Sequence, residues 1–155
     1  MRKILLAALI AVVAQNASGD CFDMAGRDYH IDPDLLRAIG FRESSFRPYV
    51  LNVVSEKSYA VGTMQIHSQN FSDLAHYGIT PQKLYADPCM NIYTGAYYLA
   101  LAFHRWGYTW RAVGAYNAGF RQTDEQEKKR NRYAGEVRNI YEQLTAKRHT
   151  SKKTG

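Results

Sequence analysis

The chain has 155 residues and a formal net charge of +6 at pH 7, with 46% hydrophobic and 22% charged residues. This length provides for one domain with a substantial core. The two cysteines exclude a cysteine-rich zinc site, and none of the five histidines stands at ligand spacing from a carboxylate or cysteine. No glycine-rich loop that could cradle a phosphate is present either, so we predict neither a metal nor a cofactor.

The first residues have the form of a secretory signal peptide. Two positive charges precede a short apolar run, Ile4–Val13, and the small residues Ala17–Gly19 offer a cleavage site. The apolar run is too short to span a membrane comfortably. We therefore predict that residues 1–19 are removed, leaving a periplasmic protein with no stable membrane span. A retained N-terminal anchor is the alternative.

Cys21 and Cys89 form the only available cysteine pair. In an exported chain they meet an oxidising compartment, so we predict a disulfide between them. In the chain-entropy model, a bridge that closes a loop of this length contributes about 4 kcal/mol to stability. The bridge would join the mature N-terminus to the middle of the domain. Two buried free thiols are the alternative.

Patterns typical of helices dominate the rest of the chain. Asp32 followed by Pro33 indicates a helix start, because an acceptor at the N-cap and a proline in the first turn both favour one. The apolar residues from Ile92 to Phe103 recur at helical spacing, and Gly107 can end that helix. In chain order we predict a helix over 32–43, a loop or short hairpin over 47–62, a helix over 64–76, a short helix from 80, a long helix over 87–106, a short helix over 109–116 and a last helix over 136–144.

Two C-terminal segments lack such patterns. Residues 119–132 are predicted to form a mobile loop, and residues 146–155 a basic, disordered tail after a domain over 20–145. Residues 121–155 carry ten basic and five acidic residues, against eight and nine in residues 20–120. This basic part could draw the protein to an anionic polymer, acidic partners or lipid head groups, or remain a solvated tail. We expect no nucleic-acid partner, because no binding motif for one is present.

Glu43 lies on the apolar face of the first predicted helix. Leu36, Ile39 and Glu43 are at i, i+3 and i+7, so a carboxylate stands where the pattern asks for a core residue. Apolar surroundings favour the acid form and raise the pKa of a carboxyl group. A proton donor that works near neutral pH needs such surroundings. For Glu43 taken alone, a solvated residue at a fraying helix end is the alternative.

Four short motifs, spaced as they would be across one domain, strengthen the first interpretation. In order they are Glu43-Ser44-Ser45-Phe46, Gly62-Thr63-Met64-Gln65-Ile66, Asp87-Pro88-Cys89-Met90-Asn91-Ile92, and Ala115-Tyr116-Asn117-Ala118-Gly119, with Tyr133 further on. Together they resemble the soluble lytic transglycosylase family of lysozyme-like proteins over about residues 21–141. The paired cysteines, small size and signal peptide resemble its branch that accompanies type III and type IV secretion systems and pili.

The resemblance implies a fold, a reaction and partners. The fold would be mainly α-helical and lysozyme-like, a single domain with at most a small β-hairpin lobe. The enzyme would be a lyase that cleaves the β-1,4 bond between N-acetylmuramic acid and N-acetylglucosamine in peptidoglycan and leaves a 1,6-anhydro end. Its partners would be glycan strands and components of a secretion system or pilus, and the protein itself would be a monomer.

The resemblance also assigns roles to single residues. Glu43 would be the catalytic acid and then the base. Amides and phenols form directional hydrogen bonds and aromatic faces stack on sugar rings, so such side chains suit a glycan cleft. The substrate-binding residues would be Gln65, Tyr116, Asn117, Tyr133 and Met64. Hydrogen bonding at helix ends, without ligand contact, is the alternative for Gln65, Tyr116 and Asn117, and core packing is the alternative for Met64.

The sequence departs from this branch at Ala60, where aspartate is frequent and could serve as a second carboxylate. The absence of an aspartate there favours a mechanism with a single carboxyl group, or lowers activity. Glu56 is a weak candidate to replace that aspartate. Two other functions are open: a hydrolase on the same fold, and a weakly active wall-binding module that recruits secretion components through its basic tail.

Overall fold

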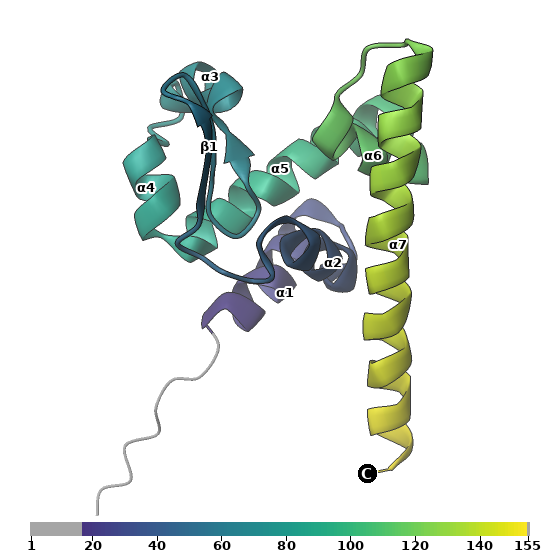
Figure 1. Ribbon diagram of the computed structural model, residues 1–155. Coiled ribbons are helices and arrows are strands. Elements are labelled where there is room, and N and C mark those ends of the chain that lie inside the picture. Colours follow the sequence, from purple (N-terminus) through teal and green to yellow (C-terminus); the bar gives the residue numbers. More distant parts are fainter. Residues whose placement is uncertain (1–16, 155) are drawn as a thin grey trace, which may run out of the picture.

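The computed structural model describes residues 17–154, most of which are helical (Figure 1). A small lobe of sheet, α3 and α4 lies on one side, the long helix α7 lies on the other, and α5 runs between them (Figure 1). The prediction of a mainly helical chain with a small β lobe is therefore confirmed. The elements are α1 Ala17–Tyr29, α2 Pro33–Ser44, β1 Leu51–Ser55, β2 Ser58–Val61, β3 Ile66–His67, the 3-10 turn Ser68–Asn70, α3 Phe71–Ala75, α4 Pro81–Ala86, α5 Pro88–Trp106, α6 Trp110–Ala118 and α7 Asp124–Lys153.

The predicted signal peptide lies mostly outside the described residues, since the description begins at Ala17. Within residues 17–154, no helix combines the length and the hydropathy that a membrane crossing requires.

Side-chain caps fix where three helices begin. Asp32 accepts a hydrogen bond from the Asp34 amide at α2, Thr80 accepts one at α4 and Asp87 accepts one at α5, and each cap is followed by a proline. At the other end of α5, Gly107 adopts a φ of +70°, which costs glycine little. These starts and this end agree with the sequence predictions.

The sheet is antiparallel and ordered β1-β2-β3, with Asn52 opposite Ala60 and Ala60 opposite His67. The predicted hairpin is thus confirmed, but the predicted helix over 64–76 is wrong in its first half. Gly62 and Gln65 have φ values of +78° and +51°, which no right-handed helix contains. The chain turns there, adds β3, and becomes helical only at α3.

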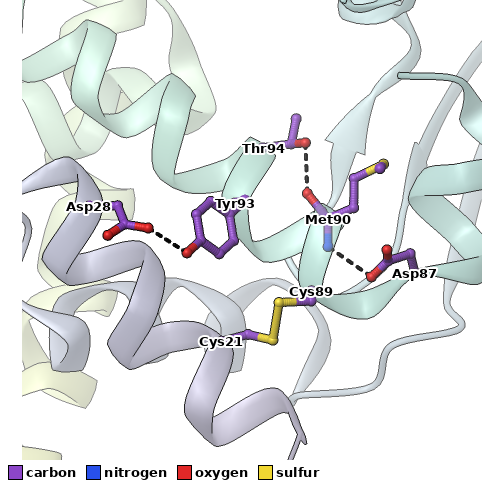
Figure 2. Close-up of a disulfide and its surroundings, with 7 residues drawn as sticks. All are labelled: Cys21, Asp28, Asp87, Cys89, Met90, Tyr93 and Thr94. Atoms are coloured by element: carbon purple, nitrogen blue, oxygen red, sulfur yellow. Dashed lines mark hydrogen bonds between the residues drawn. A yellow bond between two sulfur atoms is a disulfide. The ribbon is translucent and has the colours of Figure 1, made fainter. Parts of the chain in front are cut away.

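A disulfide joins Cys21 of α1 to Cys89 of α5, with Cα atoms 5.4 Å apart (Figure 2). The predicted pairing is confirmed. The Tyr93 hydroxyl donates to Asp28 Oδ2 at 2.7 Å, which adds a second link between the same two helices (Figure 2). Helix α1 itself was not predicted.

The core surrounds α5. Its side chains Ile92 and Leu99 are completely buried, as are Leu36 and Ile39 of α2 and Val137 of α7. The burial of Leu36 and Ile39 confirms the apolar face inferred for α2. That face turns Glu43 toward the interior as well.

Helix α7 corrects two predictions. The expected loop over 119–132 becomes helical at Asp124, and the expected disordered tail continues the same helix to Lys153. Arg130 explains the first error: it is fully buried and donates to the carbonyl oxygens of Gly119 at 2.7 Å and Arg121 at 2.9 Å. Because a buried arginine is not expected from a hydropathy pattern, nothing in the sequence indicated that this segment is helical. Near the far end, Arg148 pairs with the buried Asp34 of α2, which helps to hold the helix against the domain.

Candidate active site

Helix α2 places Glu43 at the edge of a cleft. Its side chain is 10% exposed, and the helix ends one residue later. The Ser44 hydroxyl donates to the carbonyl oxygens of Gly40 at 3.1 Å and Thr63 at 2.8 Å. Ser45 then takes the left-handed conformation of a helix C-cap. The end of α2 is thereby tied to the loop that leads into β3, so Glu43 has a fixed position.

The surroundings of Glu43 favour its acid form. Burial raises the pKa of Glu43 above its usual value, and the carboxylate of Glu136 adds to the rise. Two contacts oppose it: the Tyr133 hydroxyl donates to Glu43 Oε1 at 2.7 Å, and Arg42 Nη1 lies 3.7 Å from Oε2. Burial is the largest of these influences, so the raised pKa predicted from the helix pattern agrees with the environment of this side chain.

The cleft beside Glu43 has a volume of about 420 Å³. Helices α5 and α6 line one side, and β2, β3 and the turn after them line the other. Among the described residues that line it, Glu43 is the only carboxylate. These residues are Glu43, Ala60, Gln65, Ile66, His67, Gln69, Asn70, Tyr98, Leu101, Ala102, Ala115, Tyr116, Asn117, Gly119 and Phe120.

Tyr116 connects the two sides of the cleft. Its hydroxyl donates to the carbonyl oxygen of Met64 at 2.7 Å, and its ring lies nearly parallel to that of Tyr133, with centroids 6.4 Å apart. Burial raises the pKa of the Tyr116 phenol well above its usual value. The phenol therefore stays a hydrogen-bond donor at neutral pH.

Gln65 is held firmly on the sheet side. Its amide nitrogen donates to Gly62 O at 2.9 Å, and its Oε1 accepts a hydrogen bond of 2.7 Å from Asn52 Nδ2. These contacts stabilise the left-handed turn at Gln65, and the residue lines the cleft. Ala60, on the middle strand, lines the same side.

The structure divides the predicted substrate-binding residues into two groups. Gln65, Tyr116 and Asn117 line the cleft together with Glu43, and the exposed Asn117 side chain makes no hydrogen bond within residues 17–154. Met64 and Tyr133 do not line it, because they are only 0% and 2% exposed. Met64 packs in the core, where its carbonyl oxygen accepts the Tyr116 hydrogen bond, and Tyr133 donates to Glu43.

The family model for the transglycosylase SLT domain matches residues 20–139. The chain belongs to the SLT transglycosylase family. Its activity class is therefore that of a peptidoglycan lytic transglycosylase, as the motifs predicted.

Several relatives match this SLT chain over most of its length. X polypeptide of Escherichia coli strain K12 is 54% identical over 91% of this chain and 84% of its own. Protein IpgF of Shigella flexneri is 33% identical, covering 89% and 90%, and invasion protein IagB of Salmonella typhimurium strain LT2 is 35% identical, covering 83% and 79%.

A solved structure shows the same fold. It is an inactive mutant of lytic transglycosylase Slt from Pseudomonas aeruginosa, with a TM-score of 0.62 and 21% identity. The match covers 84% of this chain and 24% of that longer one. The lysozyme-like fold expected for an SLT domain is thereby confirmed.

Sequence reasoning missed two polar residues behind the SLT site and did not interpret a third. Arg42 of α2 and Glu136 of α7 form an ion pair beside Glu43, and no pattern in the sequence indicates that these two helices are in contact. Asn91 belongs to a recognised motif, and its amide donates to Val61 O at 2.8 Å and accepts from Met64 N at 2.8 Å. A polar residue in the apolar face of a long helix was the signal that could have revealed it.

No group of three or more metal-binding side chains occurs within the described part of the SLT domain. The residues that line the cleft provide acid–base and hydrogen-bonding chemistry, through one carboxyl group, amides, a histidine and phenols.

Proposed function

We propose that Glu43 is the single acid and base of a reaction that cleaves peptidoglycan and leaves a 1,6-anhydro end. The observation that supports this is its isolation: no other carboxylate occurs among the described residues lining the cleft. Tyr133 donates to Oε1, so the proton to be transferred is best held on Oε2. Burial keeps a fraction of Glu43 protonated at higher pH than an exposed glutamate would be.

The reaction needs two proton transfers by the same group. Glu43 first protonates the oxygen of the glycosidic bond, and the bond from that oxygen to C1 of the muramyl residue breaks. The Glu43 carboxylate then accepts the proton of the muramyl 6-hydroxyl, whose oxygen bonds to C1. Glu43 ends in its starting state, and no water is consumed.

The proposed substrate contacts come from both sides of the cleft. Gln65 and Asn117, which carry amides, and Tyr116, which carries a phenol, line it. These groups can hydrogen-bond hydroxyl and acetamido substituents of the sugars. They would hold the muramyl residue with its 6-hydroxyl close to C1, and the acetamido group of the sugar would support the charge that develops there.

A hydrolase on this fold would be expected to use a second carboxylate to activate water. Ala60 lines the cleft on the sheet side, where a longer acidic side chain would face into it. Glu56 lies in the exposed turn between β1 and β2 and does not line the cleft. This arrangement supports the single-carboxyl reaction over hydrolysis.

We further propose that the enzyme acts in the periplasm and opens the wall locally for a secretion system or pilus. The signal-peptide pattern, the disulfide and the likeness to IpgF and to a relative named an invasion protein support this role. The basic C-terminal part of α7 could contact an acidic component of such a machine. Deleting residues 146–155 should then weaken capture of that component without abolishing glycan cleavage.

Purified peptidoglycan provides the test of Glu43. We expect Glu43→Gln to lower the release of fragments roughly 10²- to 10⁴-fold, because general acid–base catalysis contributes that much. Glu56→Gln, the matched change on the sheet side, should leave the rate unchanged. Mass spectrometry of the fragments should show ends that are lighter by one water than reducing ends. Undiminished cleavage by Glu43→Gln would remove the assignment.

A further inference from the structure

Arg42 stands between two carboxylates behind the cleft. Its Nε donates to Glu136 Oε2 at 2.8 Å, whereas its Nη1 lies 3.7 Å from Glu43 Oε2. Both carboxylates attract the Arg42 guanidinium, but only Glu136 accepts a hydrogen bond from it. The position of this one positive charge therefore depends on a residue of α7 that does not itself face the substrate cleft.

Tyr133 joins this pair to Glu43. The Arg42 guanidinium lies 4.8 Å from the centre of the Tyr133 ring, and the Tyr133 hydroxyl donates to Glu43 Oε1. Tyr133 and Glu136 are three residues apart on α7, so they share one helix face. The contacts close a ring of three side chains, Glu43, Arg42 and Tyr133, and Glu136 joins it through Arg42.

We propose that Arg42 and Glu136 are positioning residues that decide how readily Glu43 holds its proton, with Glu136 keeping the Arg42 charge away from the acid. This inference rests on the proposed role of Glu43 as the catalytic acid. Arg42 by itself would stabilise the ionised form of Glu43 and so weaken it as an acid. Glu136 limits that effect in two ways, by engaging Arg42 and by contributing its own negative charge.

The other groups facing Glu43 do not duplicate this arrangement. Tyr133 from α7 and Tyr116 from α6 are phenols whose pKa values burial raises well above the usual value, so both stay neutral. His67 lines the cleft from the sheet side. The described groups that carry a fixed charge beside Glu43 are thus Arg42 and Glu136, in agreement with their opposite effects on its pKa.

A purely structural ion pair would have different consequences. The Arg42 and Glu136 side chains are 33% and 44% exposed, and an exposed pair contributes little to stability. Removing either charge should then change stability slightly and leave the ionisation of Glu43 untouched. The proposal instead predicts shifts of opposite sign for the two variants.

The test compares Glu136→Gln, Arg42→Gln and the double variant, each normalised to its own maximal turnover on solubilised peptidoglycan strands. Loss of the acid form limits turnover as pH rises, so this basic limb reports on Glu43. We expect Glu136→Gln to move the limb to lower pH and Arg42→Gln to move it to higher pH. At a fixed pH on the limb, relative activity should change about two- to five-fold in each direction, the size expected of an exposed pair. The double variant should lie between them.

Glu142→Gln is the matched control. It removes the acidic member of a second Arg–Glu pair, Arg138–Glu142, both of whose residues lie on α7. Its N–O distance of 2.9 Å is close to the 2.8 Å of the Arg42–Glu136 pair. The profile of Glu142→Gln should coincide with that of the unmodified enzyme. Shifts in the same direction, or no shift in either variant, would overturn the proposal.

A titration of the Glu43 carboxyl carbon by NMR separates this inference from the proposed function. It measures the ionisation of Glu43 without substrate, and the same opposite displacements are expected. If they are absent while Glu43→Gln abolishes cleavage, the positioning role is wrong and the catalytic role stands. If they are present while Glu43→Gln still cleaves, the catalytic role is wrong.

Discussion

The two sides of the cleft are built differently. The helical side holds a mostly buried Glu43, with Tyr133 and the Arg42–Glu136 pair behind it. The sheet side is a short three-stranded ribbon whose cleft-lining groups, together with those of the turn after it, are amides, a histidine and the aliphatic side chains of Ala60 and Ile66. In the proposed reaction, one side therefore carries the acid–base chemistry, and the other contributes hydrogen bonds and shape.

The two sides are also fastened to α5 in different ways. A disulfide from Cys89 secures α5 to α1, whereas the buried amide of Asn91, two residues on, holds the loop between β2 and β3 through Val61 and Met64. A covalent link therefore supports the helical part, and a set of hydrogen bonds supports the sheet. The difference predicts that each side can be weakened separately.

Removal of the disulfide should have the largest effect on stability. We expect Cys21→Ser combined with Cys89→Ser to lower the free energy of unfolding by about 4 kcal/mol, because the unfolded chain gains freedom. Urea unfolding of the variant measures this loss. Reduction of the unmodified protein should reproduce it, and equal stability of the reduced and oxidised forms would contradict the prediction.

Loss of the Asn91 amide should weaken the sheet side. Asn91→Ala leaves the Met64 amide and the Val61 and Leu84 carbonyl oxygens without their partner. Buried groups without partners are costly, and we expect a loss of about 3 kcal/mol. Asn139→Ala, an exposed change on α7, is the control and should unfold like the unmodified protein. A neutral Asn91→Ala would show that the loop does not depend on this residue.

Tyr133→Phe should alter the chemistry of the helical side while leaving the sheet side intact. It removes a hydrogen bond to a group that ionises, which is worth about 1.5 kcal/mol or more, so turnover should fall roughly ten-fold. The same bond lowers the pKa of Glu43, so the basic limb of the pH–activity profile should move to higher pH. Tyr85→Phe, an exposed change on α4, should alter neither, and an unmoved limb in Tyr133→Phe would argue against the contact.

Glu43 should also carry a small, pH-dependent cost to stability. Its pKa in the folded protein is raised above the ordinary value of 4.5. The contribution of Glu43 to stability is therefore fully present below pH 4.5, where the group is protonated in both states. It is lost as the pH rises through the folded pKa, because the buried side chain then becomes charged. Glu43→Gln keeps the shape and removes the charge. Its stability relative to the unmodified protein should therefore grow from pH 4 to pH 8. A difference that shrinks over this range would mean that Glu43 is better solvated than its burial indicates.

The sequence predicted the parts of the fold that depend on local chemistry. Asp32 and Asp87 start helices by capping, and the spacing of Leu36, Ile39 and Glu43 revealed the face that holds the acid. It did not predict the start of α7, because the carbonyl groups that satisfy the buried Arg130 come from the preceding loop. For the same reason, the Arg42–Glu136 contact between distant helices had no sequence signal.

Motifs identified the family better than they assigned single side chains. Met64 and Tyr133 belong to the motifs that led to the SLT family, yet both are buried and support other residues. A motif marks positions that a fold requires, but whether a side chain faces ligand or core depends on backbone turns such as the one at Gln65. Gln65, Tyr116 and Asn117 are the positions where motif and cleft agree.

In the proposed reaction, one carboxyl group on the helical side performs both proton transfers without water. Digestion of peptidoglycan in ¹⁸O-labelled water, followed by mass spectrometry of the released muropeptides, shows whether water takes part. We expect anhydro ends that contain no label, both for the unmodified enzyme and for the control Glu56→Gln. Reducing ends that carry one labelled oxygen would contradict the proposed reaction, because water would then have attacked C1.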